Sequence, residues 1–237
     1  SGTTGAAKLL PLTYELREGR FVSGNSVFGE GALANAPPML LCYPLCNISG
    51  LYSGVPAMVK GMQIVLQDRF TIEGWRDHLR RFPSREIYLP PVGVKMLLEA
   101  DVPKEELASA AYCRSGMTSL PIEVHRAFEE RYGVPILISY GATEFGGVVA
   151  QMGMDDIERW GMAAKRGSSG RAYGEAQLRI TDPDTREVLP PGSEGLLEVL
   201  VPSIRPDWSR TSDVARIDED GFLFVLGRAD GAITRGG

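Results

Sequence analysis

The sequence predicts an α/β fold with a mostly parallel sheet and flanking helices, followed by a small antiparallel β subdomain. Two patterns lead to this prediction. Between residues 39 and 139, short β-branched and apolar runs alternate with stretches in which apolar residues recur every three or four positions. After about residue 170, short apolar runs follow one another with only Gly, Pro and Asp turns between them. Alternation of strands and helices favours βαβ units, whereas strands joined by turns favour antiparallel pairing.

The first part of the chain is expected to contain five strands and four helices. The strands are predicted at residues 39–43, 62–66, 86–89, 108–113 and 134–139. The helices are predicted at residues 51–60, 72–82, 91–100 and 121–132. Thr71 is expected to cap the second of these helices, because its hydroxyl can accept from an N–H of the first turn. Gly133 is expected to end the fourth helix.

The second part of the chain is expected to be a small β structure. Its strands are predicted at residues 175–181, 194–201, 214–217 and 222–226. A mobile loop over residues 151–169 is expected to join the two parts, with no role for Lys165 or Arg166. We therefore divide the chain into an α/β subdomain at residues 1–170 and a β-barrel-like subdomain at residues 171–237.

Composition excludes several classes of protein. The chain has 237 residues, 43% hydrophobic and 23% charged, which is ordinary for a globular protein. The net charge of −5 and the absence of a dense basic cluster argue against a nucleic-acid partner. There is no run of eighteen apolar residues, so no membrane span is expected, and nothing in the first residues has the pattern of a signal peptide. These features favour a cytoplasmic protein.

The cysteines and histidines show no pattern typical of a metal site or of a catalytic base. Cys42, Cys46 and Cys113 lack metal-ligand spacing, so reduced thiols are expected. His78 is surrounded by charged residues and is interpreted as a surface residue, not as a catalytic base. His125 lies off the apolar stripe of its predicted helix, so it is also expected to be exposed.

The segment Tyr140–Gly147 concentrates chemical groups at the end of the predicted strand 134–139. Ligands bind at this edge in open α/β sheets. Tyr140 can offer a ring face to a base, and Gly141 lets a ligand approach the backbone. Thr143 can donate to a phosphate oxygen, and Glu144 can hold a hard cation such as Mg²⁺. A tight turn with a capping Thr and a solvated Glu is the structural alternative.

The two ends of the chain carry further candidates. Residues 1–8 contain three hydroxyls, two glycines and a terminal Lys8, a composition that can surround phosphate oxygens. A flexible tail is the alternative, and the segment is not a Walker loop. Asp213 has two acceptor oxygens that suit a vicinal diol, and Arg228 presents a fixed fork of donors. A turn carboxylate is the alternative for Asp213.

Three segments in this order resemble the adenylate-forming family, which comprises acyl- and aryl-CoA synthetases, peptide-synthetase adenylation domains and luciferases. The segments are a Ser/Thr/Gly loop ending in Lys, then Tyr-Gly-x-Thr-Glu, and a closing segment in which Thr211-Ser212-Asp213 matches Thr-Gly-Asp and is followed by Gly-Arg-x-Asp. Ala7 stands where the family usually has Pro, and Ser212 replaces the Gly of Thr-Gly-Asp. The resemblance implies that a carboxylic acid is activated by ATP as an acyl-adenylate and then transferred to the thiol of CoA.

The resemblance also implies roles for individual residues. The catalytic residues it implies are Thr143, Glu144 and Lys8, with Glu144 also as the Mg²⁺ ligand. The nucleotide-binding residues it implies are Ser1, Gly2, Thr3, Thr4, Gly5, Lys8, Gly116, Met117, Ser139, Tyr140, Gly141, Ala142, Thr143, Asp213 and Arg228. The residues it implies for the acid pocket are Asn47, Ser115, Met117, Gly141 and Gly147.

Departures from the family pattern bear on the acid. Cys46 and Asn47 stand where Phe and His are frequent, and Met117 replaces a small residue. Asn47 as a helix cap and Met117 as a core gap-filler are the alternatives. No Asp lies between Phe28 and Gln67, which argues against an α-amino acid substrate.

Two other functions stay open. The acceptor could be a carrier protein in place of CoA, or the chain could bind nucleotide without turnover. The resemblance also implies that the opening of the large domain and the small C-terminal domain, with its adenylation Lys, lie outside these residues. We therefore expect the 237-residue chain alone to turn over slowly or not at all. Expected partners are a small carboxylic acid, ATP and CoA, and a homodimer is left open.

Overall fold

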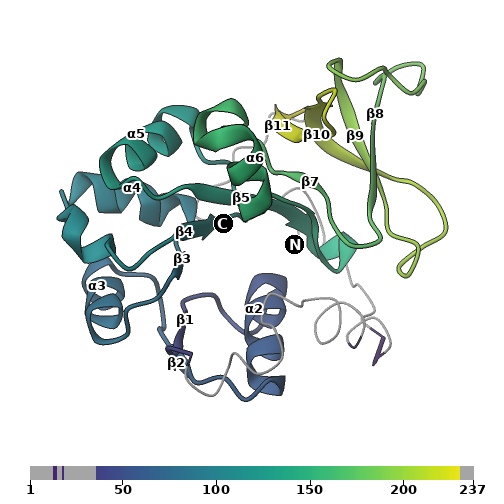
Figure 1. Ribbon diagram of the computed structural model, residues 1–237. Helices are drawn as coiled ribbons and strands as arrows, with labels where there is room; N and C mark the ends of the chain where they lie inside the picture. The colour runs from purple at the N-terminus through teal and green to yellow at the C-terminus, as the bar shows by residue number, and fades with distance from the viewer. Residues whose placement is uncertain (1–12, 15–17, 19–35, 230–237) are drawn as a thin grey trace.

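The computed structural model describes residues 13, 14, 18 and 36–229 and confirms the predicted fold class. Figure 1 shows an α/β part followed by a separate antiparallel sheet near the end of the described chain. Residues 1–8, which include the predicted phosphate-binding residues, lie outside the described part. Within the described part, no helix is long and apolar enough to cross a membrane.

The largest sheet has five strands in the order β3-β4-β5-β6-β7. Strands β3 (Glu86–Tyr88), β4 (Tyr112–Ser115) and β5 (Ile136–Ala142) are parallel, as predicted. Strands β6 (Gly147–Gln151) and β7 (Arg171–Ala172) add to it in the antiparallel sense. The sheet is therefore parallel on one side and antiparallel on the other.

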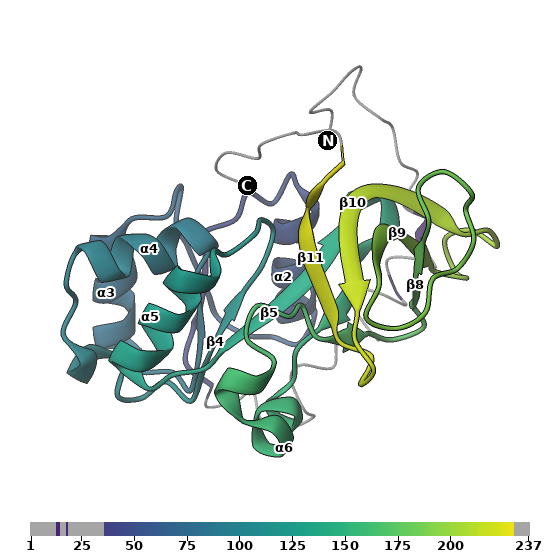
Figure 2. The same cartoon turned by 90° about the horizontal axis from the view of Figure 1, so that it is seen from above.

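Three helices cover one side of this sheet: α3 (Ile72–Arg81), α4 (Pro91–Glu99) and α5 (Ile122–Tyr132). They share a buried core with the parallel strands, in which Val94, Leu97 and Phe128 are fully enclosed beside Ile136. In both views these helices gather at the end of the molecule away from β8–β11 (Figures 1 and 2). The apolar stripes of the sequence thus become the helix–sheet interface.

The predicted helix boundaries rest on caps that the structure contains. The Thr71 hydroxyl accepts from the N–H of Gly74 at 3.2 Å and starts α3. Gly133 ends α5 with a φ of 68°, a left-handed conformation that glycine adopts without steric cost. Both predictions are confirmed.

A smaller unit lies across from these helices. It consists of the parallel pair β1 (Met39–Leu41) and β2 (Ile64–Leu66) with α2 (Ile48–Val59). Its own small core contains Met39, Leu41 and Ala57. Figure 1 shows α2 facing the sheet from the side opposite α4 and α5. A space between α2 and the central sheet results, and the site described below lies there.

The last strands form a four-stranded antiparallel sheet in the order β11-β10-β9-β8. They are β8 (Gln177–Thr181), β9 (Glu194–Leu200), β10 (Ser209–Ile217) and β11 (Leu223–Arg228). Their core also includes Phe145, Val149 and Ala150 from the β5–β6 region, so the two parts pack against each other. Figure 2 shows β10 and β11 side by side at one edge of this sheet. The proposed boundary at residue 170 stays a prediction.

The segment predicted as a mobile loop is instead ordered around α6 (Met154–Ala164). The Lys165 ammonium contacts the carboxylates of Asp218 and Asp220 at 2.8 and 2.7 Å. The Arg166 Nε donates to Glu129 at 2.7 Å. The loop prediction and the lack of roles for the two cations were wrong, because ion pairs to distant segments leave no local sequence pattern.

His125 is also a correction. It was expected on the surface, but it is only 2% exposed on α5. Its Nε2 lies 3.1 Å from the Glu129 carboxylate, which also accepts from the N–H of Ile136. Nε2 is therefore paired, whereas the buried Nδ1 has no hydrogen-bond partner among the described residues. His78 is half-buried on α3, so its surface assignment holds only in part.

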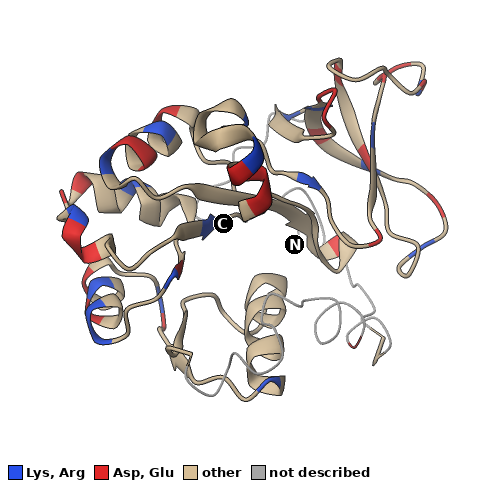
Figure 3. Ribbon diagram, viewed as in Figure 1, with Lys and Arg blue, Asp and Glu red and all other residues tan. Residues whose placement is uncertain are grey.

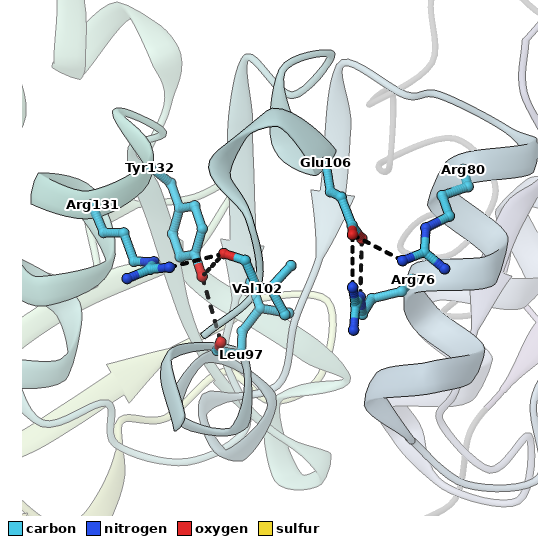
Figure 4. Close-up of polar contacts among 7 residues, drawn as sticks. All are labelled: Arg76, Arg80, Leu97, Val102, Glu106, Arg131 and Tyr132. Carbon is cyan, nitrogen blue, oxygen red and sulfur yellow. Dashed lines mark hydrogen bonds and ion pairs between the residues drawn. The ribbon is translucent and has the colours of Figure 1, made fainter. Parts of the chain in front are cut away.

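Charged residues of both signs occur throughout the α/β part, and many of them form ion pairs. Figure 3 shows both blue and red segments along the helices of the α/β part. The ion network around η2 (Lys104–Leu107) is an example (Figure 4). Glu106 accepts from Arg76 through both carboxylate oxygens, at 3.0 and 2.7 Å, and from Arg80 at 2.8 Å. These contacts link α3 to the segment that precedes β4.

The hairpin between β5 and β6 has little room for a side chain at one position. A Cβ on Gly141 would lie 2.2 Å from the carbonyl oxygen of Gly147 and 2.7 Å from its carbon. The register also shifts between Tyr140 and Gly141. Glycine is required here because the backbone of the neighbouring strand occupies the space.

We expect Glu106→Gln to reduce the free energy of unfolding in a pH-dependent way. The hydrogen bonds from Arg76, opposed by burial and aided by Arg80, lower the pKa of Glu106 from 4.5 to about 2. A lowered native pKa contributes stability above the unfolded pKa and loses it as the pH falls towards 2. Urea unfolding of the unmodified protein and of Glu106→Gln at pH 7, 4 and 2 should therefore show a difference in the free energy of unfolding that becomes smaller as the pH falls. Asp77→Asn, in an exposed pair at 3.5 Å, is the control; an equal effect at every pH would contradict the assignment.

We expect Gly141→Ala to destabilise the protein by roughly 2 kcal/mol or more, since backbone atoms of β6 must move. Gly153→Ala is the matched control, because the nearest side-chain atom would lie 3.6 Å from its Cβ and its φ is −106°. Its cost should stay below about 1 kcal/mol. Chemical denaturation of both variants measures the difference; equal midpoints would show that the hairpin can open at no cost.

Candidate functional site

The segment 140–147 forms a hairpin rather than following a strand end. Strand β5 continues through Ala142, so Tyr140 and Gly141 lie within it. Thr143 and Glu144 form the short 3-10 helix η3 (Thr143–Phe145), and Gly146 closes the turn with a φ of 63°. The tight turn that was the structural alternative is present. It also brings every group of the segment to one edge of the sheet.

A cavity of about 150 Å³ opens beside this hairpin, between α2 and the central sheet. We call it the central cavity. Its walls come from β1 and the residues after it, α2, β3, β4 and its following turn, and the β5–β6 hairpin. The lining residues are Met39, Tyr43, Ile48, Ser49, Tyr52, Ser53, Tyr88, Arg114, Ser115, Gly116, Met117, Ser139, Gly141, Ala142, Gly147, Val148 and Gln151.

Most of the residues expected in the acid pocket meet at this cavity. Four of them, Ser115, Met117, Gly141 and Gly147, are in its lining. Three residues expected at the nucleotide, Gly116, Ser139 and Ala142, line it as well. The structure therefore brings together residues that are up to 32 positions apart, from Ser115 to Gly147. Their roles towards a ligand stay predictions.

Asn47 is the exception. Its side-chain oxygen accepts from the N–H of Gly50 at 2.9 Å, and Asn47 is the N-cap of α2. The lining of the central cavity does not include it. The structure thus shows Asn47 in the helix-capping role that was the alternative.

Ser115 and Met117 have unusual surroundings. Ser115 is 4% exposed, and its hydroxyl has no hydrogen-bond partner among the described residues. Met117 has a φ of 76°, a left-handed conformation that is unfavourable for a side chain of this kind, and it is 42% exposed at the cavity. Met117 is therefore not a core gap-filler. Unsatisfied and strained residues of this kind concentrate where ligands bind.

Tyr140 and Asp213 meet although they are 73 positions apart. The Tyr140 hydroxyl donates to Asp213 Oδ2 at 2.5 Å. Burial, together with the Asp213 charge, raises the pKa of Tyr140 well above its ordinary value, so the phenol stays a donor. Asp213 pairs across the strands with Arg228, whose Nη2 donates to Ser212 at 2.5 Å. We call Tyr140, Asp213 and Arg228 the polar strip.

Thr143 and Glu144 lie half-buried in η3, directly after the last residue of β5. No group of three or more acidic, His or Cys side chains that could hold a metal occurs in the described part of the chain. A single carboxylate fits Mg²⁺ nonetheless, because this ion keeps several waters and is commonly held by one or two carboxylates together with substrate phosphates. Glu144 as the Mg²⁺ ligand stays a prediction.

Sequence reasoning missed part of the cavity wall. Tyr43, Tyr52, Tyr88 and Arg114 line it, but none of them was assigned to the site. For Arg114 a signal existed: a guanidinium at the end of a buried strand, directly before the Ser-Gly turn. The three tyrosines gave no such signal, because each of them fits the ordinary apolar pattern of its strand or helix.

Comparisons with known proteins agree with this geometry. The family model of the AMP-binding enzymes matches residues 1–204. A sulfoacetate–CoA ligase from Cupriavidus necator is 29% identical over all of this chain and 48% of its own length. A 2-succinylbenzoate–CoA ligase from Bacillus mycoides is 28% identical over all of this chain and 50% of its own length. The chain thus spans about half the length of these curated relatives.

Solved structures share the fold. ATP-bound MatB from Rhodopseudomonas palustris superposes with a TM-score of 0.72 at 23% identity, covering 84% of this chain and 41% of that one. The AMP complex of O-succinylbenzoate Coenzyme A synthetase from Bacillus subtilis gives a TM-score of 0.67 at 24% identity, covering 83% and 42%. The family model covers most of the chain, including the turn after β4 and the β5–β6 hairpin, and the chain therefore belongs to the family of AMP-binding, adenylate-forming enzymes.

Proposed function

We propose that this chain forms the acid- and nucleotide-binding part of an ATP-dependent acid–CoA ligase. One observation carries the proposal: the β5–β6 hairpin borders the central cavity and also supplies Tyr140 to the polar strip. An acid in the cavity and a nucleotide along the strip would therefore meet at one hairpin. The names of the relatives, which are CoA ligases, favour CoA over a carrier protein as the acceptor.

The proposed reaction has two steps. A carboxylate oxygen of the acid attacks the α-phosphorus of ATP, the bond from that phosphorus to the bridging oxygen breaks, and pyrophosphate leaves. The CoA thiol then loses its proton and attacks the acyl carbon, and AMP leaves with the electron pair of the C–O bond. Both steps concentrate negative charge near phosphorus, so positioned donors and cations dominate the catalysis.

The residues have the following proposed roles. Thr143 donates to the α-phosphate, and Tyr140 lies against the adenine with its hydroxyl fixed by Asp213. The second oxygen of Asp213 and the guanidinium of Arg228 are directed to the ribose. Mg²⁺, when bound at Glu144, would neutralise phosphate charge.

The remaining predicted residues complete the two regions. Gly141 lines the central cavity and is proposed to contact the acyl group through its backbone. Residues 1–8, with Lys8, are proposed to hold the β- and γ-phosphates and lie outside the described part. A protein that binds nucleotide without turnover is the outcome the following test would reveal.

We expect Glu144→Gln to lower adenylation in the full-length protein by about 100-fold or more, as removal of a charge-stabilising group does elsewhere. Acid-dependent exchange of labelled pyrophosphate into ATP measures this step without CoA. Glu130→Gln, an exposed carboxylate on α5, is the matched control and should leave the exchange rate unchanged.

Each of three outcomes would contradict one part of the proposal. Full activity in Glu144→Gln would remove that residue from the site. No exchange with any of a panel of acids would favour a binding module. Rapid acyl-CoA formation by the 237-residue chain alone would refute the expectation that residues outside it supply an essential group.

A further inference from the structure

A cation lies in the wall of the central cavity. Arg114 is near the end of β4, and its side chain is 21% exposed. It shares a sheet face with Glu86 and Tyr112, since residues two apart on a strand point to the same side. Arg114 and Tyr88 line the cavity from this face, whereas Glu86 is not in the lining. The positive partner of the ion pair thus borders the cavity, and the negative partner lies behind it.

The guanidinium is oriented by this pair. Arg114 Nε donates to Glu86 Oε1 at 2.7 Å, and the Tyr112 hydroxyl donates to Glu86 Oε2 at 2.8 Å. Both oxygens of Glu86 are therefore engaged, and the plane of the guanidinium is fixed from its Nε side. The two terminal nitrogens carry four further N–H donors. A planar fork of this kind matches the geometry of a carboxylate or a sulfonate.

The rest of the wall also favours an anion. Among the described residues that line the cavity, none is Asp or Glu, and Arg114 is the charged one. Ser49, Ser53 and Tyr88, which carry hydroxyl groups, are in the same lining. Burial and the Glu86 charge raise the pKa of Tyr88, so its phenol remains protonated. Ser115, the residue next to Arg114, has the buried hydroxyl that lacks a partner among the described residues.

The cavity is small. Its volume of about 150 Å³ is similar to that of an engineered cavity that holds one benzene molecule. An acyl chain of a few carbon atoms fits this space. The cavity extends from Arg114 on β4 to Gly141 on the hairpin. One acid could therefore contact the cation with one end and present its reacting carboxylate at the hairpin with the other.

We propose that the acid of this enzyme is short and carries a second anionic group, a carboxylate or a sulfonate, which pairs with Arg114 and accepts from Ser115. The inference rests on the proposed function, because it names the substrate class of the same site. A charge-assisted, bidentate contact in a half-buried wall discriminates strongly against an acid that ends in a methyl group, because the guanidinium would then lose water without gaining a partner. Arg114 is a specificity-determining residue in this scheme.

The test compares matched pairs of acids in the full-length protein. Malonate is paired with propionate, and succinate with butyrate, so each pair differs in its second anionic group. Acid-dependent pyrophosphate exchange gives kcat/KM for each acid. We expect the unmodified protein to prefer the dianion of at least one pair by about 30-fold or more, the range of hydrogen bonds to charged groups. In Arg114→Met this ratio should fall towards one.

Three further variants separate specificity from folding. Arg126→Met, an exposed cation on α5, should leave the ratio unchanged. Glu86→Gln removes the buried counter-charge but keeps an acceptor oxygen that can hold Arg114 Nε in the same orientation, so the ratio should stay high. The double variant Glu86→Gln with Arg114→Met leaves neither charge unpaired, and it should fold and show the low ratio. Thermal unfolding verifies that each variant is folded before the comparison is made.

The outcomes distinguish this inference from the proposed function. If the unmodified protein activates monoanions as well as dianions, or if Arg114→Met keeps the preference, the inference is overturned and the ligase function stands. An equal loss in Glu86→Gln would also overturn it, since Arg114 would then act only through that pair. If no acid supports exchange, the proposed function fails. Calorimetric binding of malonate, compared with propionate and with Arg114→Met, then decides the inference alone.

Discussion

The hydrogen bond from Tyr140 to Asp213 is the contact on which the candidate site depends. It joins β5 of the central sheet to β10 of the last sheet at 2.5 Å, with a buried phenol as the donor. The core around Phe145, Val149 and Leu197 packs the same two regions together nearby. Because a buried donor without an acceptor is costly, separation of the two sheets would leave the phenol unpaired as well as expose that core. The polar strip is therefore held at a fixed distance from the hairpin.

Lys165 and Arg166 reinforce this arrangement from the far side. Lys165 reaches the β10–β11 turn through Asp218 and Asp220, and Arg166 reaches α5 through Glu129. The Lys165 side chain is 12% exposed; burial opposes its charge, but the two carboxylates raise its pKa overall. Consecutive residues thus contact both parts of the molecule. An ion pair in this position acts less as a source of stability than as a constraint on geometry, because desolvation offsets much of the attraction.

Much of the fold was predictable because its signals are local. Thr71 and Gly133 fix helix ends through their own backbone chemistry, and the apolar periodicity identified the helices behind them. Helix α6 escaped prediction because Gly161, at a φ of 77°, interrupts it, and because its support comes from residues far away in the chain. His125 was misplaced for the same reason, since its pairing with Glu129 belongs to a network completed by Arg166. For the site, residue types identified the hairpin, but the convergence of Tyr140 with Asp213 could be expected only from the family resemblance.

The wall of the central cavity shows why the identity of the acid is hard to predict from the sequence. The hairpin and the polar strip would serve any carboxylic acid, since they face the parts of the reaction common to all of them. The part of the molecule that differs from one acid to another would contact Arg114, Ser115 and Met117, which line the cavity in and just after β4. Glu86 accepts from Arg114 Nε although it lies 28 positions away in the chain, and Met117 adopts a φ of 76° in the turn after β4. The proposed selectivity therefore depends on the orientation of a few side chains, and the left-handed φ of Met117 is backbone strain of the kind that concentrates where ligands bind.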